Sequence, residues 1–183
     1  VLSAKGGILL TGKTVKSIEV ISGKISGIQL SNGKRLHADA YVSTIPFNNL
    51  TEILPESIGK NTFFSTGSNL DYAPIIGIHL WYDRQIMEQA FLAVLNNPVQ
   101  WVFNKTRIQG SDDLPRQHIC ISVSGARGYI DQSKDELREL FASEMERLFP
   151  LAREAHIERF LVVKQPQATF RSIPRVAQLR YPW

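Results

Sequence analysis

Residues 14–46 read TVKSIEVISGKISGIQLSNGKRLHADAYVSTIP, and this stretch decides the fold of the N-terminal part of the chain. Two runs of mostly apolar and polar alternation are separated by Ser22-Gly23, and a third, shorter run follows Asn32-Gly33. Dipeptides of this kind favour tight β-hairpin turns, and Asn-Gly is the strongest signal for a two-residue turn. The pattern predicts a three-stranded antiparallel meander.

A fourth, buried strand is expected directly after the meander. The apolar run Ala40-Tyr41-Val42 ends at Ser43-Thr44-Ile45-Pro46. Proline lacks the amide hydrogen that a strand donates to its neighbour, so the strand must stop there. Residues 47–54 then predict a short helix that begins at an asparagine cap and is stopped by Pro55.

A second set of strands follows a polar stretch that ends at Leu70. In the third of its candidate strands Val99, Trp101 and Phe103 share one face, and Gln100 and Asn104 share the other. This period of two predicts a half-buried antiparallel sheet. The candidate strands are residues 74–83, 91–95, 99–105, 117–124 and 157–164, with a hairpin turn at 96–98.

One long helix is predicted between the last two strands. Ser133 stands three residues before Glu136, which is the spacing of a capping box. Leu137 and Phe141 begin an apolar stripe at helical spacing that continues to Phe149, so one face of this helix must pack on the sheet. The expected fold class is α+β, an antiparallel sheet covered by a helix and preceded by the β-meander.

The meander resembles the adenine-side segment of flavin-dependent amine oxidases and of carotenoid and squalene desaturases. Those families read T-x-V-x-x-I, a glycine-bearing hairpin, A-D, and an apolar strand that closes on A/S-x-P. The resemblance continues in PIIGIHLWYDRQIM (74–87), NNPVQWVFNK (96–105) and LVVKQPQATF (161–170), and it extends over nearly the whole chain. In their order and spacing these segments are similar to the squalene-associated FAD-dependent desaturases, a branch associated with hydroxysqualene dehydroxylation in bacterial hopanoid synthesis.

The resemblance implies that the chain is divided between two lobes. Residues 1–50 would be part of an FAD-binding lobe, residues 51–165 a substrate-binding lobe, and residues 166–183 a segment that returns toward the FAD lobe. The backbone of Val15 would contact the adenine end of FAD, and the turn from Ser43 to Pro46 would lie near the same cofactor. The resemblance assigns no catalytic residue.

The sheet would wall an apolar tunnel for a C30 isoprenoid. The residues expected to face this substrate are His79, Trp81, Trp101 and Phe103. An ordinary core position is the competing interpretation for each aromatic residue. His79 shares a face with Trp81, so it is a candidate to protonate a leaving hydroxyl group, and a satisfied core or surface histidine is the alternative.

No G-x-G-x-x-G turn, which would hold the FAD pyrophosphate at a helix N-terminus, occurs in these 183 residues. We therefore expect a piece of a longer FAD-dependent oxidoreductase that, on its own, neither holds FAD nor turns over. The residues leave open whether the whole enzyme dehydroxylates hydroxysqualene or carries out squalene- or phytoene-type desaturation. A flavin amine oxidase would need polar or acidic tunnel residues. A non-enzymatic module that binds an apolar ligand would need no cofactor-contacting meander.

Composition excludes several other functions. Cys120 is the only cysteine, so no internal disulfide forms, and we expect a small packed thiol with no base or cation beside it. No His or Cys pair has metal-ligand spacing, so no metal site is expected. The net charge of +4 is spread thinly, which argues against nucleic acid as a partner. An apolar isoprenoid is the expected partner, and the expected location is cytoplasmic, with peripheral contact to the inner membrane kept open.

Overall fold

A computed structural model describes residues 2–67, 69–111 and 115–179. Contacts within the chain divide it into two compact units, one made of Val1–Leu70 with Ser172–Trp183 and the other of Asp71–Arg171. The chain therefore passes between units at residues 70–71 and 171–172. The lobes expected from the sequence change over at residues 50–51 and 165–166.

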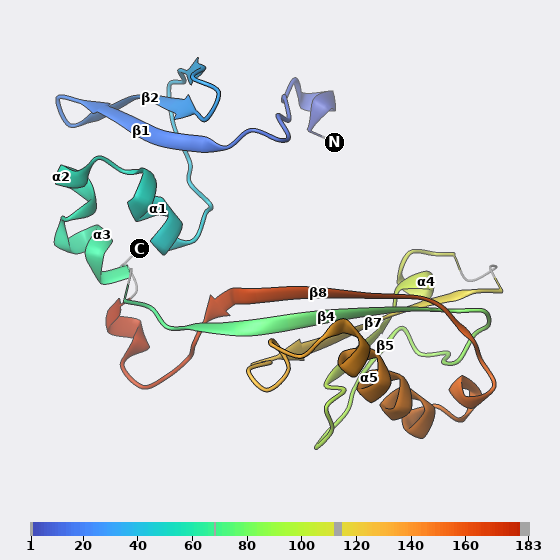
Figure 1. Cartoon of the computed structure of the whole chain (residues 1–183). Helices are drawn as coiled ribbons and strands as arrows, with labels where there is room; N and C mark the ends of the chain where they lie inside the picture. Colours follow the sequence, from blue (N-terminus) through green and yellow to red (C-terminus); the bar gives the residue numbers. More distant parts are fainter. Residues whose placement is uncertain (1, 68, 112–114, 180–183) are drawn as a thin grey trace. The chain divides into compact units, whose positions relative to one another are not determined.

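The first unit contains the predicted meander. Its antiparallel strands are β1 (Val15–Ile21), β2 (Lys24–Leu30) and β3 (Arg35–Leu36), in that spatial order. Figure 1 shows β1 beside β2. The turn between β1 and β2 has positive φ at both central residues, 50° at Ser22 and 77° at Gly23. This is the conformation that matches the twist of a two-residue hairpin, and it confirms the first predicted turn.

The second turn differs from the two-residue hairpin that Asn32-Gly33 predicts. The Leu30 amide donates to the Lys34 carbonyl at 2.8 Å, and the Gly33 amide donates to the Leu30 carbonyl at 2.9 Å. Only Gly33 has a positive φ, 83°. The connection is thus a three-residue loop in which the glycine takes the left-handed position after an ordinary turn.

The predicted fourth strand is absent. Residues 40–42 belong to no strand, and the side chain of Val42 is 90% exposed. A strand needs a hydrogen-bonding neighbour, and no strand of the described chain pairs with this run. Its apolar composition alone therefore gave a wrong prediction.

Three short helices complete the first unit: α1 (Phe47–Ile53), α2 (Glu56–Gly59) and α3 (Thr62–Gly67), with one-turn helices η1 (Ser3–Lys5) and η3 (Val176–Leu179) near the chain ends. The helix α1 confirms the predicted helix, but its cap residue is Pro46 and no side chain caps it. The predicted asparagine cap is therefore wrong. Pro46 has a fixed φ of −57° that leads the chain into the helix one residue before the first asparagine.

The second unit is built on a five-stranded antiparallel sheet in the order β5-β6-β7-β4-β8. Its strands are β4 (Tyr72–Tyr82), β5 (Phe91–Ala93), β6 (Trp101–Asn104), β7 (Gln117–Ser124) and β8 (Ile157–Phe170). All five predicted strands are confirmed, and β8 continues beyond its predicted end.

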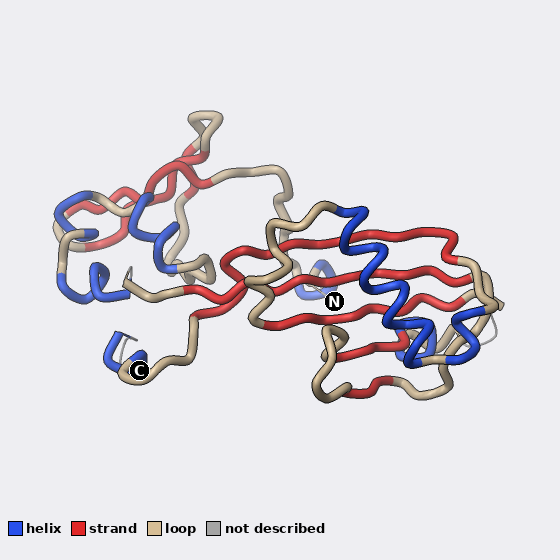
Figure 2. Tube along the Cα trace, turned by 60° about the horizontal axis from the view of Figure 1, so that its bottom comes forward, coloured by secondary structure: helices blue, strands red, loops and turns tan. Residues whose placement is uncertain are grey.

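The helix α5 (Lys134–Leu148) runs across one face of this sheet, as Figure 2 shows. Its first turn carries the predicted capping box: the Glu136 amide donates to Ser133 Oγ at 3.2 Å, and the Ser133 amide donates to Glu136 Oε2 at 2.7 Å. Leu137, Phe141 and Met145 are fully buried against the alternate residues of the strands. The remaining helices are α4 (Lys105–Ile108) and η2 (Pro150–Arg153).

β6 alternates as expected, with Trp101 and Phe103 on one face and Asn104 on the other, whereas Val99, which was grouped with Trp101, precedes the strand and is fully buried. Val102 and Asn104 are buried beneath α5, whereas the side chain of Trp101 is 44% exposed on the other side of the sheet. Asn104 is satisfied there because its Nδ2 donates to the Met87 carbonyl at 3.2 Å. The pairing with β7 decides which face of β6 is buried, and the two faces of this short strand are both rich in large side chains.

Candidate functional site

The candidate site is the face of the five-stranded sheet that is turned away from α5, here called the open face. It consists of the side chains that alternate with the core residues along each strand. The four residues predicted to face a substrate, His79, Trp81, Trp101 and Phe103, all belong to it, and none of them is in the buried core. Its other members include Phe91, Gly77, His118, Cys120, Arg159, Leu161 and Val163.

One part of the open face is a row of aromatic rings. Trp101 stacks on Phe103 with ring centroids 6.2 Å apart, and Phe103 lies 6.4 Å from Phe91. Antiparallel pairing of β5 with β6 places Phe91 directly opposite Phe103. Phe91 and Trp101 are both exposed. Large exposed apolar side chains gathered on one surface indicate that a partner or ligand covers them.

The other part is a polar cluster on β4 and β7. His79 Nδ1 and His118 Nε2 lie 3.0 Å apart, so one imidazole donates a hydrogen bond to the other. The Trp81 ring stacks on His118 with centroids 4.2 Å apart, and the Arg159 guanidinium lies 4.7 Å from the centre of the Trp81 ring. The register that pairs Trp81 with His118 and His79 with Cys120 creates this cluster.

Both histidines are held in the neutral form. Burial lowers the pKa of His118 to about 4, and the neighbouring His79, Lys105 and Arg159 act in the same direction. Burial and then Lys105 lower the pKa of His79 as well. A hydrogen bond between two imidazoles needs one nitrogen without a proton, and these environments preserve it at neutral pH.

The sequence suggested that no base flanks Cys120, and this expectation is wrong. Cys120 Sγ lies 3.9 Å from His79 Nε2 on the neighbouring strand. Burial nevertheless raises the pKa of the Cys120 thiol, against a smaller opposing effect of Lys105. The thiol therefore stays protonated and packs as a small side chain that meets the imidazole edge.

A cavity of about 370 Å³ lies within the first unit, between the meander, the 41–45 segment, α1 and α3. Val15 and Ser43, two of the residues expected near FAD, line it, whereas Pro46 is not part of its wall. Isoleucine, leucine and valine make up most of the lining, and no charged side chain contributes. The aliphatic lining fits the face of a flat aromatic ring such as adenine and does not fit a diphosphate.

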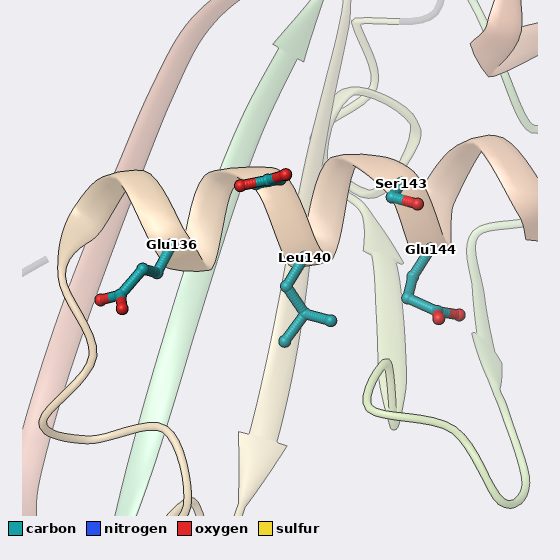
Figure 3. A pocket seen from close by; sticks show the side chains of 5 residues that line it. Glu136, Leu140, Ser143 and Glu144 are labelled. Atoms are coloured by element: carbon teal, nitrogen blue, oxygen red, sulfur yellow. The ribbon is translucent and has the colours of Figure 1, made fainter.

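A further hollow, of about 350 Å³, lies on the outer side of α5, where Figure 3 shows Glu136, Leu140, Ser143 and Glu144 along the helix. Two of the three carboxylates that line it, those of Glu136 and Glu144, have partners within the fold. Glu136 closes the capping box, and Glu144 accepts from Asn97 at 2.7 Å and from Arg147 at 2.7 Å. These groups stabilise the helix and its contact with the β5–β6 loop, so the hollow is not a candidate for chemistry.

Reasoning from the sequence missed His118 as part of the site. Alternation along β7 placed it opposite the core residues, but the register between β7 and β4, which joins it to His79, is not visible in a single sequence. Within the described ranges no three His, Cys, Asp or Glu side chains gather as metal ligands. Across the same ranges, no helix has the length and apolar character needed to cross a membrane.

Comparison with known proteins places these features in a family. Residues 2–175 match the family described as flavin containing amine oxidoreductase. The 15-cis-phytoene desaturase of Synechococcus elongatus is 26% identical over 191 residues, which cover 98% of this chain and 40% of that protein. The chain thus spans about two fifths of the length of this curated relative.

Two solved structures share the fold. An oxidoreductase from Methanosarcina mazei has a TM-score of 0.71 at 19% identity, over 90% of this chain and 40% of that one. A reduced UDP-galactopyranose mutase has a TM-score of 0.70 at 14% identity, over 96% of this chain and 38% of that one. At these identities the likeness concerns the fold alone.

Proposed function

Because the chain belongs to the family of flavin containing amine oxidoreductases, we propose that it supplies the adenine-side meander and one substrate wall of an FAD-dependent oxidoreductase. The observation that carries this proposal is the open face, where aromatic and aliphatic side chains are exposed on a rigid sheet whose other face is a closed core. A ligand pocket needs such a pre-formed apolar wall.

FAD, when bound, accepts a hydride from the substrate and so carries the redox chemistry of the enzyme. In this chain Val15 and Ser43 would lie against its adenine, since both line the apolar cavity of the first unit. That cavity offers no cation, so the diphosphate must find its ligands elsewhere. We therefore expect the 183-residue chain by itself to retain no FAD after purification.

The proposed substrate is a long isoprenoid chain. Trp101, Phe103, Leu161 and Val163 expose apolar surface on the open face, and covering such surface is worth about 25 cal/mol per Å² without any polar contact. The relative that is named 15-cis-phytoene desaturase supports phytoene-type desaturation as the reaction of the whole enzyme.

Hydroxysqualene dehydroxylation, a C30 reaction of hopanoid synthesis, is the second candidate. The observation that favours it is the His79–His118 pair, a polar group in an otherwise apolar and aromatic surface. A pure hydrocarbon would leave His79 Nε2 with only the long contact to Cys120 Sγ at 3.9 Å, whereas a hydroxyl group would supply a stronger hydrogen bond. Peripheral contact with a membrane, from which such a substrate would be drawn, remains part of this proposal.

The proposal is tested by isoprenoid retention. The chain is incubated with detergent-dispersed phytoene or squalene, and the isoprenoid that co-elutes with it in gel filtration is quantified. Trp101→Gln should weaken binding by ~1–3 kcal/mol, roughly five- to hundredfold, because it places an amide against hydrocarbon. Leu95→Gln is the matched control, since Leu95 is an exposed apolar residue of the β5–β6 loop. Equal retention by the Trp101 variant and the wild type would refute the assignment of this wall.

A further inference from the structure

Gly77 leaves a small hollow beside His79 on the open face. A Cβ atom built on Gly77 would lie 3.8 Å from His79 Nε2 and 3.9 Å from Val163 Cβ, which is ordinary van der Waals contact. An alanine would therefore fit without strain and would occupy this space. Because Gly77 has no Cβ atom, this space stays open next to His79 Nε2 on the open face. The nearest recorded polar atom to this nitrogen is Cys120 Sγ, at 3.9 Å.

The two imidazoles form a chain with two outward ends. Neutral histidine carries one proton on its two nitrogens, so a hydrogen-bonded neutral pair has one proton in the bridge and a second proton at one outer end. The inner nitrogens are His79 Nδ1 and His118 Nε2, 3.0 Å apart, and the outer ones are His79 Nε2 and His118 Nδ1. In either tautomer of the pair, one outer nitrogen donates and the other accepts.

The charges that face the pair oppose any net gain of a proton. Lys105 and Arg159 bear on His118, Lys105 bears on His79, and the remaining titratable neighbour, Cys120, is a neutral thiol. The positive charges of Lys105 and Arg159 disfavour an imidazolium, which would be a third positive charge beside them. A transfer that takes up one proton while releasing another leaves the pair neutral and avoids this cost.

We infer that His79 and His118 form a two-ended proton relay, with His79 Nε2 above Gly77 as the end that meets a ligand. A proton from the ligand bonds to His79 Nε2, the proton on His79 Nδ1 crosses the bridge to His118 Nε2, and His118 Nδ1 releases its proton to water. One proton enters, one crosses and one leaves, and both rings are neutral before and after.

The use of this relay in catalysis rests on the proposed function. Desaturation removes a hydride and a proton from adjacent carbons; bound FAD would supply the hydride acceptor, and the His79–His118 relay would take the proton. In the reverse sense, with the starting tautomers exchanged, the same pair delivers a proton to a departing hydroxyl. The relay thus fits an isoprenoid whose reacting carbon lies over Gly77, between the aromatic row and the strand β8.

The relay is tested by ¹⁵N NMR of the chain labelled at its four histidines. The expected result is a bridging proton coupled to both His79 Nδ1 and His118 Nε2. Geraniol, an isoprenoid alcohol, serves as the probe: it should shift His79 Nε2 and, through the bridge, His118 Nδ1 as well. A bridging proton coupled to one nitrogen only, or a geraniol shift confined to His79 or missing from both rings, would overturn the relay.

Two variants and one control sharpen this test. His118→Gln should abolish the bridging signal, and His156→Gln, at an exposed histidine, should leave it unchanged. Gly77→Ala should keep the bridge but lose the geraniol shift at both rings, because its methyl group fills the hollow. A geraniol shift that survives in Gly77→Ala places the working end elsewhere and refutes the assignment. The wild-type couplings and the alanine variant decide the matter even if His118→Gln fails to fold.

The outcomes separate the relay from the proposed function. Phytoene retention that depends on Trp101, together with uncoupled histidines, would leave the isoprenoid wall standing and remove the relay. Coupled histidines in a chain that retains neither phytoene nor squalene would keep the relay and remove the proposed substrate.

Discussion

The two faces of the five-stranded sheet are made from alternate residues of the same strands, yet one face is a buried core and the other is exposed. Beneath α5, Ile76, Ile78, Ile119 and Ile121 are fully buried, and the few polar groups there have partners within the chain with the exception of the Tyr82 hydroxyl. On the open face, aromatic rings and two histidines remain accessible.

This difference separates stability from function. The covered face contributes the close packing that keeps the sheet rigid. The open face can therefore carry exposed apolar and polar side chains without being needed for folding. Substitutions on the two faces should accordingly be distinguishable, and four predictions test this.

The largest effect is expected for a large-to-small substitution beneath α5. Phe141 is fully buried and meets Tyr129 edge to face at 5.9 Å, so Phe141→Ala should cost about 3–5 kcal/mol in the free energy of unfolding. Phe103→Ala, the same change on the open face, should cost about 1 kcal/mol or less. Urea unfolding measures both. Equal losses would show that the open face also supports folding.

A buried amide should rank second. Gln117 Oε1 accepts from the amides of Ile86 and Met87, at 2.8 and 3.2 Å, and its Nε2 donates to the Met87 carbonyl at 2.8 Å. Gln117→Ala should cost about 2–3 kcal/mol because the buried amides of Ile86 and Met87 lose the acceptor that Gln117 supplies. Gln100 clamps the Ser124 backbone in a similar way near solvent, so Gln100→Ala should cost less than about 1 kcal/mol. A reversed order in urea unfolding would contradict the role given to burial.

The two histidines of the open face should make the stability of the chain depend on pH. The pKa of His118 falls from an ordinary value of 6.5 to about 4 on folding, so the unfolded chain takes up this proton first as pH decreases. The free energy of unfolding therefore keeps its full value above pH 6.5 and decreases as the pH falls from 6.5 toward 4. His79 acts in the same direction.

Urea midpoints measured across this pH window should drop less steeply in His118→Gln than in the wild type. His156→Gln is the control substitution, since His156 is an exposed histidine in the loop that precedes β8. Identical slopes in the wild type and the His118 variant would mean that this histidine keeps its ordinary pKa.

The smallest effect is expected at the hydroxyl of Tyr82. It is buried and has no hydrogen-bond partner among the described residues, and burial raises the pKa of the phenol well above its usual range. Tyr82→Phe removes the unsatisfied group and keeps the ring, so stability should stay the same or rise by up to about 1 kcal/mol. A clear loss in thermal or urea unfolding would reveal a partner, such as a buried water molecule, for this hydroxyl.

Much of the fold was predictable because its signals are local. The alternation in residues 74–83 and 117–124 predicted β4 and β7, and the Ser133–Glu136 spacing predicted the start of α5. The missing fourth strand had an equally apolar sequence. A strand forms only where another strand pairs with it, and residues 40–42 alone do not indicate whether such a partner exists.

The candidate site was predictable only in part. Alternation placed His79 and Trp81 on one face, which is where they lie. It also placed Trp101 and Phe103 on one face of β6 and Asn104 on the other, which the structure confirms, but it grouped the buried Val99 with Trp101. A short strand with large side chains on both faces gives no local indication of which one will be covered.

By itself, the sequence determined the strands, the capped helix and the resemblance to flavin-dependent oxidoreductases, since periodicity, turn residues and caps act over a few neighbouring positions. Only the tertiary structure decided which face stays open and which histidines meet. His79 and His118 are separated by 39 positions in the chain and become partners through the register of β4 against β7. That register follows from packing the whole core beneath α5, a condition that no single segment contains.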